Sequence, residues 1–292
     1  MAKDKFTKSW ITENSEIIVQ RYEDGVLTIR GLHYQLVSIG MTNSFQHYKR
    51  VVDAMKDARW NGLISFEKFS DNDREMIGKT ENEETDLESG IERGKENIEG
   101  WMKYYFKNRW ENQEYYPEMF IEKKALQGVF EPICRRYDVG LGACKGYPSL
   151  TFLNDTAKRF IEQEENGKIP VILYFGDYDP SGEDIPRSIE ENIRQLGCSS
   201  IRLIRFALMK SQVLEWNLPP APTKQGDSRT ANWDGLGQVE LDAVDPYKLQ
   251  ELAEEAIKSV FDQDSYEELL EIQKIEKKEY KKAMRKFVLE MK

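Results

Sequence analysis

The sequence has 292 residues, and it lacks any apolar run long enough to cross a bilayer. A membrane span needs about 20 consecutive apolar residues, so a membrane is not among the expected partners. The N-terminal residues lead into no apolar secretion segment. The expected location is therefore the cytoplasm, in association with the nucleoid if the chain is bacterial or phage-encoded.

Cysteine is also scarce, and the three cysteines form no recognisable site. Cys134, Cys144 and Cys198 are odd in number and widely spaced, and no Cys-x-x-Cys pair is present. This pattern supports neither a disulfide framework nor a zinc ribbon, and reduced, mostly structural thiols are expected. The sequence also lacks a Gly-x-x-x-x-Gly-Lys-Ser/Thr loop, so any ATP-driven turnover requires a separate ATPase subunit.

Positive charge is in the minority, because the formal net charge is −10. The whole chain therefore has no overall electrostatic attraction to nucleic acid. The acids are unevenly spread: residues 1–60 contain nine Lys or Arg against seven Asp or Glu, and residues 67–99 are crowded with acids. Because phosphate contacts depend on a local basic patch, DNA remains a candidate partner.

The most informative stretch is an apolar run at residues 171–175 that stops at two acids. Pro170 and Gly176 bound this run, which predicts a buried strand. Asp177 and Asp179 follow it, and a helix with acids in its first turn is expected after them. In a parallel sheet this edge is where ligands bind. Two interpretations are open for the acids: turn chemistry, or a site for a hard divalent cation.

Strands and helices alternate from residue 117 onward, which predicts an α/β fold with a parallel sheet and right-handed crossovers. Glu122 ends an early strand and should leave the sheet at the same edge as Asp177 and Asp179. These three acids predict a Mg²⁺ site, for which Mn²⁺ can substitute. The predicted strands are residues 119–122, 139–144, 171–175 and 201–206, and the predicted helices are residues 124–137, 150–165 and 182–196.

Three short helices are predicted before the sheet, at residues 9–22, at residues 28–39 and from Thr42 or Asn43 onward. The third is basic and carries Lys49 and Arg50, and residues 62–66 read as a possible wing strand. This order suggests a winged helix-turn-helix that binds DNA.

The second predicted helix carries a polar pair on its outer side. Arg30 and Tyr34 are one turn apart and lie off the apolar stripe of this helix. The tyrosine hydroxyl is therefore expected to reach water beside a guanidinium.

Two segments before the sheet keep more than one interpretation. Residues 67–99 read as a solvated linker or an irregular helix. Residues 101–110 are aromatic and helix-like, and they either pack on the next domain or contact nucleic acid.

The segments after the sheet are also open in role. Residues 217–229, which include Lys224, form a Pro-rich loop that either covers the sheet edge or contacts substrate. Residues 239–243 form a short alternating strand whose two acids are either solvated or part of a second metal site. Helices are predicted at residues 247–261 and 266–292, and the second helix either pairs with another copy or folds back on the sheet.

Three motifs, in this order, carry a resemblance to a known family. They are Phe-Ile-Glu-Lys-Lys-Ala-Leu around Glu122, Cys-Lys-Gly-Tyr-Pro around Lys145, and Gly-Asp-Tyr-Asp-Pro-Ser-Gly around Asp177 and Asp179. They resemble the Toprim domain of type IIB topoisomerase A subunits and of the related meiotic double-strand-break protein. The whole chain looks closest to stand-alone phage or mobile-element "topoisomerase mini-A" relatives.

In that family a CAP-like winged-helix domain precedes the Toprim domain and supplies a nucleophilic tyrosine from an Arg-x-x-[Phe/Tyr]-Tyr segment. Arg30-Gly-Leu-His33-Tyr34 resembles this segment, and the resemblance covers roughly residues 10–65 and 115–210. Two positions depart from the family pattern. His33 replaces Phe or Tyr, and Ser149 replaces the Asp that usually continues the Gly-Tyr-Pro loop.

The resemblance implies a division of the chain: a winged helix at residues 1–66, a linker and aromatic helix at 67–114, a Rossmann-like Toprim domain at 115–245, and a helical extension at 246–292. It also implies a homodimer, in which the tyrosine of one subunit meets the metal site of the other.

The chemistry implied by the resemblance is a Mg²⁺-dependent DNA strand break. Tyr34 would attack a phosphate and become linked to the 5′ end, and Arg30 would stabilise the developing charge. His33 and Lys224 are accessory candidates, and the loop with Lys145 and Gly146 is expected to approach DNA. Two alternatives remain: a Toprim nuclease that uses metal-activated water, and a non-catalytic DNA-binding protein.

Overall fold

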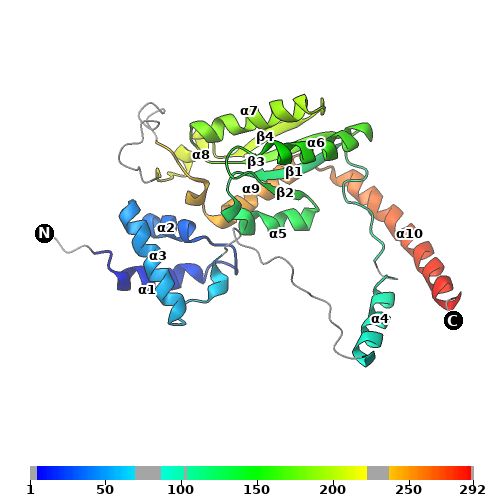
Figure 1. Ribbon diagram of the computed structural model, residues 1–292, viewed down its shortest axis with the longest axis horizontal. Helices are drawn as coiled ribbons and strands as arrows, with labels where there is room; N and C mark the ends of the chain where they lie inside the picture. The colour runs from blue at the N-terminus through cyan, green and yellow to red at the C-terminus, as the bar shows by residue number, and fades with distance from the viewer. Residues whose placement is uncertain (1–4, 70–86, 102–103, 222–236, 291–292) are drawn as a thin grey trace. The chain divides into compact units, whose positions relative to one another are not determined.

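The computed structural model describes residues 5–69, 87–101, 104–221 and 237–290 (Figure 1). Contacts divide the chain into two compact units, of which the first comprises Met1–Arg74 and Tyr115–Val260. The second comprises Glu75–Glu114 and Phe261–Lys292. No helix among the described residues is long and apolar enough to cross a membrane.

The first unit begins with three helices, as the sequence predicts. They are α1 (Lys8–Val19), α2 (Ile29–Ser38) and α3 (Phe45–Trp60). Each starts at a hydroxyl residue whose oxygen accepts a backbone hydrogen bond from the first turn, which satisfies one of the free amides there. Thr28 does this for α2, where the Gly31 amide donates at 2.8 Å.

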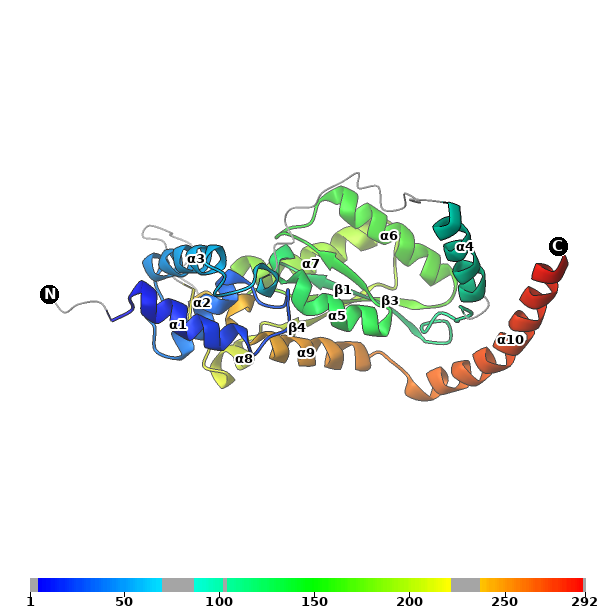
Figure 2. The same ribbon diagram turned by 90° about the horizontal axis from the view of Figure 1, so that it is seen from below.

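A small core holds these helices together. The three helices contact one another, and their fully buried residues include Leu32 and Leu36 of α2, Ile11 of α1, and Val51 and Met55 of α3. Figure 2 shows the three helices side by side. The periodicity of apolar residues therefore predicted this part of the fold correctly.

The wing strand predicted at residues 62–66 is wrong. Gly62 takes a left-handed backbone angle, φ +71°, that turns the chain after α3. Residues Phe66–Lys68 then form a 3₁₀ helix, η1, capped by the Ser65 side chain. The guanidinium of Arg59 lies 5.5 Å from the Phe66 ring, and the chain then makes a single parallel bridge between Phe69 and Leu27.

A four-stranded parallel sheet forms the centre of the first unit. Its strands are β1 (Tyr115–Ile121), β2 (Gly140–Ala143), β3 (Ile169–Phe175) and β4 (Arg202–Ala207), in the order β2-β1-β3-β4. Ile121 pairs with both Ala143 and Phe175, so three strands end level with one another. The predicted α/β class and parallel sheet are confirmed, and the residues that follow β1 and β3 emerge at one edge.

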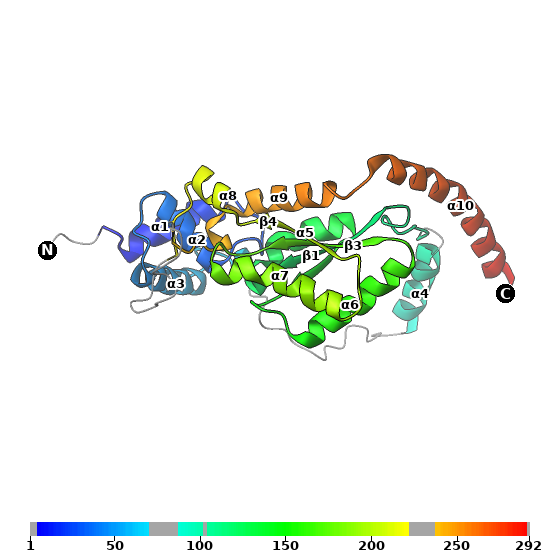
Figure 3. The same cartoon turned by 90° about the horizontal axis from the view of Figure 1, so that it is seen from above.

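Helices cover both faces of the sheet. α6 (Leu150–Glu165) and α7 (Pro180–Gln195) lie on one face (Figure 3), and α5 (Gln127–Tyr137) and α9 (Pro246–Lys258) pack together on the other (Figure 2). Short elements complete this unit: η2 (Lys124–Leu126), α8 (Lys210–Glu215) and η4 (Leu241–Ala243).

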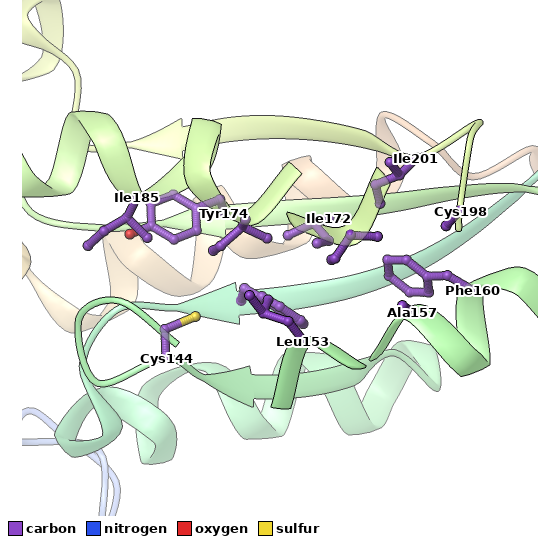
Figure 4. Packing of buried hydrophobic residues seen from close by; sticks show 12 residues of the cluster. Cys144, Leu153, Ala157, Phe160, Ile172, Tyr174, Ile185, Cys198 and Ile201 are labelled. Carbon is purple, nitrogen blue, oxygen red and sulfur yellow. The ribbon is translucent and has the colours of Figure 1, made fainter. Parts of the chain in front are cut away.

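The main core lies between the sheet and helices α6 and α7. Ile172 and Tyr174 of β3 point into it and meet Leu153, Phe160 and Ile185 (Figure 4). Every residue of the run 171–175 is fully buried. Because β3 is covered on both faces, its sequence is continuously apolar instead of alternating.

The second unit contains a long helix, α10 (Gln263–Glu290), and a shorter helix, α4 (Leu87–Trp101). The helix predicted over residues 101–110 is wrong, because α4 ends at Trp101 and residues 104–108 form no helix. Tyr105 instead stacks on Tyr280 of α10 with ring centroids 5.1 Å apart. Of the predicted linker, residues 70–86 lie outside the described residues.

Gly182 of α7 allows the chain after β3 to turn closely on itself. A Cβ atom at this position would overlap the carbonyl oxygen of Asp177 and lie 3.0 Å from its carbonyl carbon. We expect Gly182→Ala to lower the free energy of unfolding by about 2 kcal/mol or more, because backbone atoms cannot move aside cheaply.

Chemical denaturation of the two alanine variants and the parent protein measures this. The matched control is Gly94→Ala in α4, where a Cβ has nothing within 4 Å. That change should be neutral or should stabilise by up to about 1 kcal/mol, since alanine favours helix. Equal effects at the two positions would contradict the close approach at Gly182.

Candidate functional site

Two of the predicted acids meet at the edge of the sheet. Glu122 follows β1 directly, and its side-chain Oε2 accepts a hydrogen bond of 2.9 Å from the backbone amide of Asp177, which follows β3. Burial raises the pKa of Glu122, and the nearby charge of Asp179 adds to this effect. The parallel sheet thus brings Glu122 and Asp177 together, as its topology requires.

Asp179 is used differently from the other two acids. Its Oδ1 atom accepts a 2.6 Å hydrogen bond from the Gly182 amide, so Asp179 caps the N-terminus of α7. This is the turn and capping role that one interpretation of the sequence gave to the pair.

Lys123 is the hub of the site. Its Nζ atom lies 3.0 Å from Asp177 Oδ2, 3.0 Å from Asp242 Oδ2 and 3.9 Å from Glu240 Oε2. Burial favours the neutral amine, but the three carboxylates outweigh burial and raise the pKa of Lys123. Lys123 is therefore a fixed ammonium shared by carboxylates from two distant parts of the chain.

Two of these carboxylates belong to residues 237–245, which we call the strap. The strand predicted at residues 239–243 is wrong: Val239 makes one antiparallel bridge with Tyr178, and η4 follows. The expectation that its acids are solvated is also wrong. Asp242 is 4% exposed and Glu240 is half-buried. They can be buried because Lys123 and Arg30 neutralise them.

The strap is bonded to the helices on one side and to the sheet on the other. Thr28 Oγ1 donates to Asp242 Oδ1 at 3.1 Å, which ties the start of α2 to the strap. The Leu241 amide donates to Asp177 Oδ1 at 2.8 Å, which ties the strap to the edge of the sheet.

Arg30 and Tyr34 form the predicted pair on α2, with Arg30 Nη2 donating to the Tyr34 hydroxyl at 3.3 Å. The expectation that this hydroxyl reaches water is wrong. Tyr34 is 2% exposed, because the strap lies against this side of α2. The hydroxyl instead donates to Glu240 Oε2 at 3.0 Å.

These contacts determine the charge states of the tyrosine and its partner. Burial, together with the charge of Glu240, raises the pKa of Tyr34, so the phenol keeps its proton. Burial alone would raise the pKa of Glu240, but Lys123 and Arg30 outweigh it and lower that pKa. Glu240 is therefore a carboxylate that joins Tyr34 and Arg30 to Lys123 and Asp177 within one chain.

His33 lies beside Tyr34. The side chain is fully buried, and Nε2 lies 3.1 Å from Asn43 Oδ1. Burial lowers the pKa of His33 to about 4, so the ring is neutral near pH 7. Its ring packs against Tyr34 and Tyr48, with centroids 5.6 Å away in both cases.

The predicted DNA-contacting residues lie in two places. Lys49 is exposed on α3 and Arg50 is half-buried beside it. Lys145 and Gly146 have left-handed backbone angles and help to line a pocket of about 550 Å³. The pocket also contains Glu122, Lys123, Lys124 and Ala125, and is therefore rich in lysine. Lys224 lies outside the described residues.

A larger cavity of about 730 Å³ adjoins Tyr34. Lys248 contributes to its lining, and the Lys248 ammonium lies 4.0 Å from the centre of the Trp216 ring. The cavity is lined by α2, the chain after α8, and the strap with the start of α9: Tyr34, Gln35, Val37, Ser38, Glu215, Trp216, Asn217, Leu218, Pro219, Ala243, Val244, Asp245 and Lys248.

The three predicted metal ligands do not fit a Mg²⁺ ion as they are arranged. In the described ranges, no group of three or more His, Cys, Asp or Glu side chains is placed to hold a metal ion. The reason is visible at each acid: Lys123 occupies the space beside Asp177, Asp179 caps α7, and Glu122 binds the Asp177 amide.

Lys123, Glu240 and Asp242 were not predicted from the sequence as members of the site. A signal existed for the last two, because their alternation places both acids on one side of the chain. Nothing local indicated that a lysine 117 residues earlier would neutralise Glu240 or that Arg30, 210 residues earlier, would bind it. Comparisons of this chain with models of known families, with curated proteins and with solved structures found no match.

Removing the charge of Lys123 should destabilise the protein strongly. We expect Lys123→Met to reduce the free energy of unfolding at pH 7 by about 3–5 kcal/mol, because it leaves buried carboxylates without a cation. Lys124→Met removes the same charge from the next residue and should cost less than about 1 kcal/mol. Chemical denaturation of both variants measures this, and equal losses would show that Lys123 is not the hub.

The site should also make stability depend on pH. Burial raises the pKa of Asp177 to about 7 against the opposing effect of Lys123, and Glu122 contributes to the rise. Between 3.8, the ordinary value, and about 7, the folded protein thus holds a proton that the unfolded chain releases. The stabilisation is complete below that range and is lost as the pH rises through it, with a slope of at most about 1.4 kcal/mol per pH unit.

We therefore expect Asp177→Asn, which mimics the protonated acid, to flatten the pH dependence of unfolding between about pH 5 and 8. Urea denaturation across this range measures the slopes of the variant and the parent. Parallel slopes in the two proteins would mean that Asp177 does not hold the proton.

Proposed function

We propose that this chain breaks DNA strands by transesterification, with Tyr34 as the nucleophile and Arg30 as the cation that stabilises the reacting phosphate. One observation supports the proposal: the Glu240 carboxylate contacts Tyr34 and Arg30 of α2 and also Lys123. Lys123 in turn binds Asp177 at the edge of the sheet. A hydroxyl nucleophile next to a guanidinium and an ammonium suits attack on a phosphodiester.

In the proposed step, the Tyr34 oxygen forms a bond to phosphorus as its proton passes to a base. The bond from phosphorus to the 3′ oxygen breaks, and that oxygen leaves with the electron pair and takes a proton from water. The products are a 5′-phosphotyrosine and a 3′ hydroxyl. Arg30 lowers the barrier by neutralising charge on the phosphate oxygens as it develops.

The contacts proposed for DNA follow from the positions of basic groups. The lysine-rich pocket with Lys145 and Gly146 lies next to Glu122, and Lys49 and Arg50 lie on α3. These groups would contact the phosphate backbone without reading the sequence. The finer fold assignments of the same proposal are a CAP-like helix-turn-helix domain, a Toprim domain and a helical extension, and the order of the elements supports them. The first of these has no strand at the predicted wing, residues 62–66.

Mg²⁺ or Mn²⁺ is part of the proposal because of the type of ligand atoms at the edge of the sheet. Glu122, Asp177 and Asp179 supply the hard oxygen ligands that these ions prefer. The arrangement of these acids does not fit a metal ion, and the step described above does not involve one. A homodimer is part of the proposal because cutting both strands requires two tyrosines. A separate ATPase subunit is part of it because the sequence has no Gly-x-x-x-x-Gly-Lys-Ser/Thr loop.

A second candidate function is hydrolysis of DNA by an activated water molecule. The burial of Tyr34, at 2% exposure, favours it, because a buried hydroxyl has a structural use without chemistry. In that case cleavage would leave free 5′ phosphates, and Tyr34 would be needed only for stability.

The test is a cleavage assay on end-labelled duplex and supercoiled DNA with Mg²⁺ or Mn²⁺, stopped with detergent and run with and without protease. We expect label that enters the gel only after protease, and its loss in Tyr34→Phe. Tyr48→Phe is the matched control, because the Arg30 guanidinium also lies 4.7 Å from the Tyr48 ring.

The control variant should keep full covalent attachment. Free-ended products that survive Tyr34→Phe and disappear in Asp177→Asn would reject transesterification and support hydrolysis. If the parent protein and all variants bind DNA without cleaving it, only a non-catalytic binding role would remain.

A further inference from the structure

We infer that Glu240 is an internal mimic of a phosphate group, and that Arg30, Tyr34 and Lys123 form an oxyanion-binding site which the strap fills with its own carboxylate. The site itself is inferred from the contacts of these residues. Its assignment to the reacting phosphate of DNA rests on the proposed function.

The geometry of one oxygen atom is the basis for this inference. Glu240 Oε2 receives Arg30 Nε at 2.7 Å and the Tyr34 hydroxyl at 3.0 Å, and it lies 3.9 Å from Lys123 Nζ. Two cations and a hydroxyl thus converge on a single anionic oxygen. Guanidinium, ammonium and hydroxyl donors are those that bind phosphate oxygens in proteins.

The donors are held in place independently of Glu240. The Arg30 guanidinium packs on two rings, 5.1 Å from the centre of Tyr34 and 4.7 Å from that of Tyr48. Lys123 is held by Asp177 and Asp242, each at 3.0 Å. An anion that replaced the Glu240 carboxylate would therefore meet preorganised donors, and little rearrangement would oppose its binding.

Exchange of the two anions does not require the strap to leave. The Glu240 side chain is 26% exposed, so it lies at the protein surface. The strap is fixed through other residues: Val239 pairs with Tyr178, the Leu241 amide binds Asp177, and Asp242 binds Thr28. Rotation of the Glu240 side chain to another rotamer would carry the carboxylate to solvent and open the site.

The internal carboxylate is a competitor tethered to its own site. A tethered group has a high effective concentration, so an external phosphate must compete with it. Removing the carboxylate should therefore strengthen phosphate binding. A catalytic use of Glu240, as the acceptor of the Tyr34 proton, makes the opposite prediction, because its removal would then slow the reaction without improving binding.

The first experiment measures binding of inorganic phosphate to the full chain by calorimetry at constant ionic strength. We expect Glu240→Gln and Glu240→Ala to bind phosphate about tenfold more tightly than the parent, and Arg30→Gln combined with Glu240→Gln to lose the gain. Asp242→Asn is the control for charge, since it removes one negative charge from the same strap and Asp242 binds Lys123 but is not the carboxylate that receives Arg30 and Tyr34. Its gain should be clearly smaller.

Thermal unfolding of each variant ensures that folded proteins are compared, and Glu240→Gln keeps the shape of the side chain if Glu240→Ala unfolds. Unchanged phosphate affinity in Glu240→Gln, or equal gains in Glu240→Gln and Asp242→Asn, would overturn the inference. The second outcome would mean that only net charge matters.

The second experiment uses the covalent attachment assay on DNA, where Glu240→Gln should increase the yield of adduct by several-fold. A fall in adduct with unchanged phosphate affinity would overturn the inference and assign Glu240 to proton transfer. Tighter phosphate binding without adduct in any variant would reject the proposed function and keep the site. Tyr34-dependent adduct without a change in phosphate affinity would reject the anion site and support the proposed function.

Discussion

The ammonium of Lys123 is the interaction on which the rest of the site depends. One cation lies beside three carboxylates, two from the strap and one from the edge of the sheet. Without it, Asp242 would be a buried charge with too few partners, and such charges are costly. The ammonium therefore allows acids from distant segments to pack together, and their packing places α2 and the sheet edge in one site.

The same neutralisation explains why the candidate catalytic groups are covered. Arg30, Tyr34 and Lys123 each bind a carboxylate of the protein itself, so the two cations and the hydroxyl all have partners in the free chain. For a negatively charged substrate, binding then means that the substrate replaces the Glu240 carboxylate. Such an arrangement keeps the free chain stable and links access to the tyrosine to the side chain of Glu240.

The sequence predicted the parts of the fold that depend on local patterns. The apolar run of β3, the alternation of strands and helices and the stripe of α2 each specify an element through periodicity. The failures involve partners that are distant in sequence. The prediction of solvated acids at residues 239–243 was wrong because Lys123 and Arg30 bind these acids. The strand predicted there was also wrong. The exposure of Tyr34 was wrong because the strap, about 200 residues later, covers it. Asp179 shows a different limit, because the same motif can cap a helix or bind a metal ion, and the sequence does not distinguish the two.

The most direct test of the account is to locate the attachment on the protein by mass spectrometry. A DNA adduct trapped with detergent would be digested with nuclease and trypsin. Cleavage after Arg30 and Lys49 yields one peptide that contains both Tyr34 and Tyr48. The account predicts a nucleotide attached to Tyr34, identified by fragmentation of this peptide. A nucleotide on Tyr48, or on a residue outside the peptide, would contradict the assignment of Tyr34 as the nucleophile.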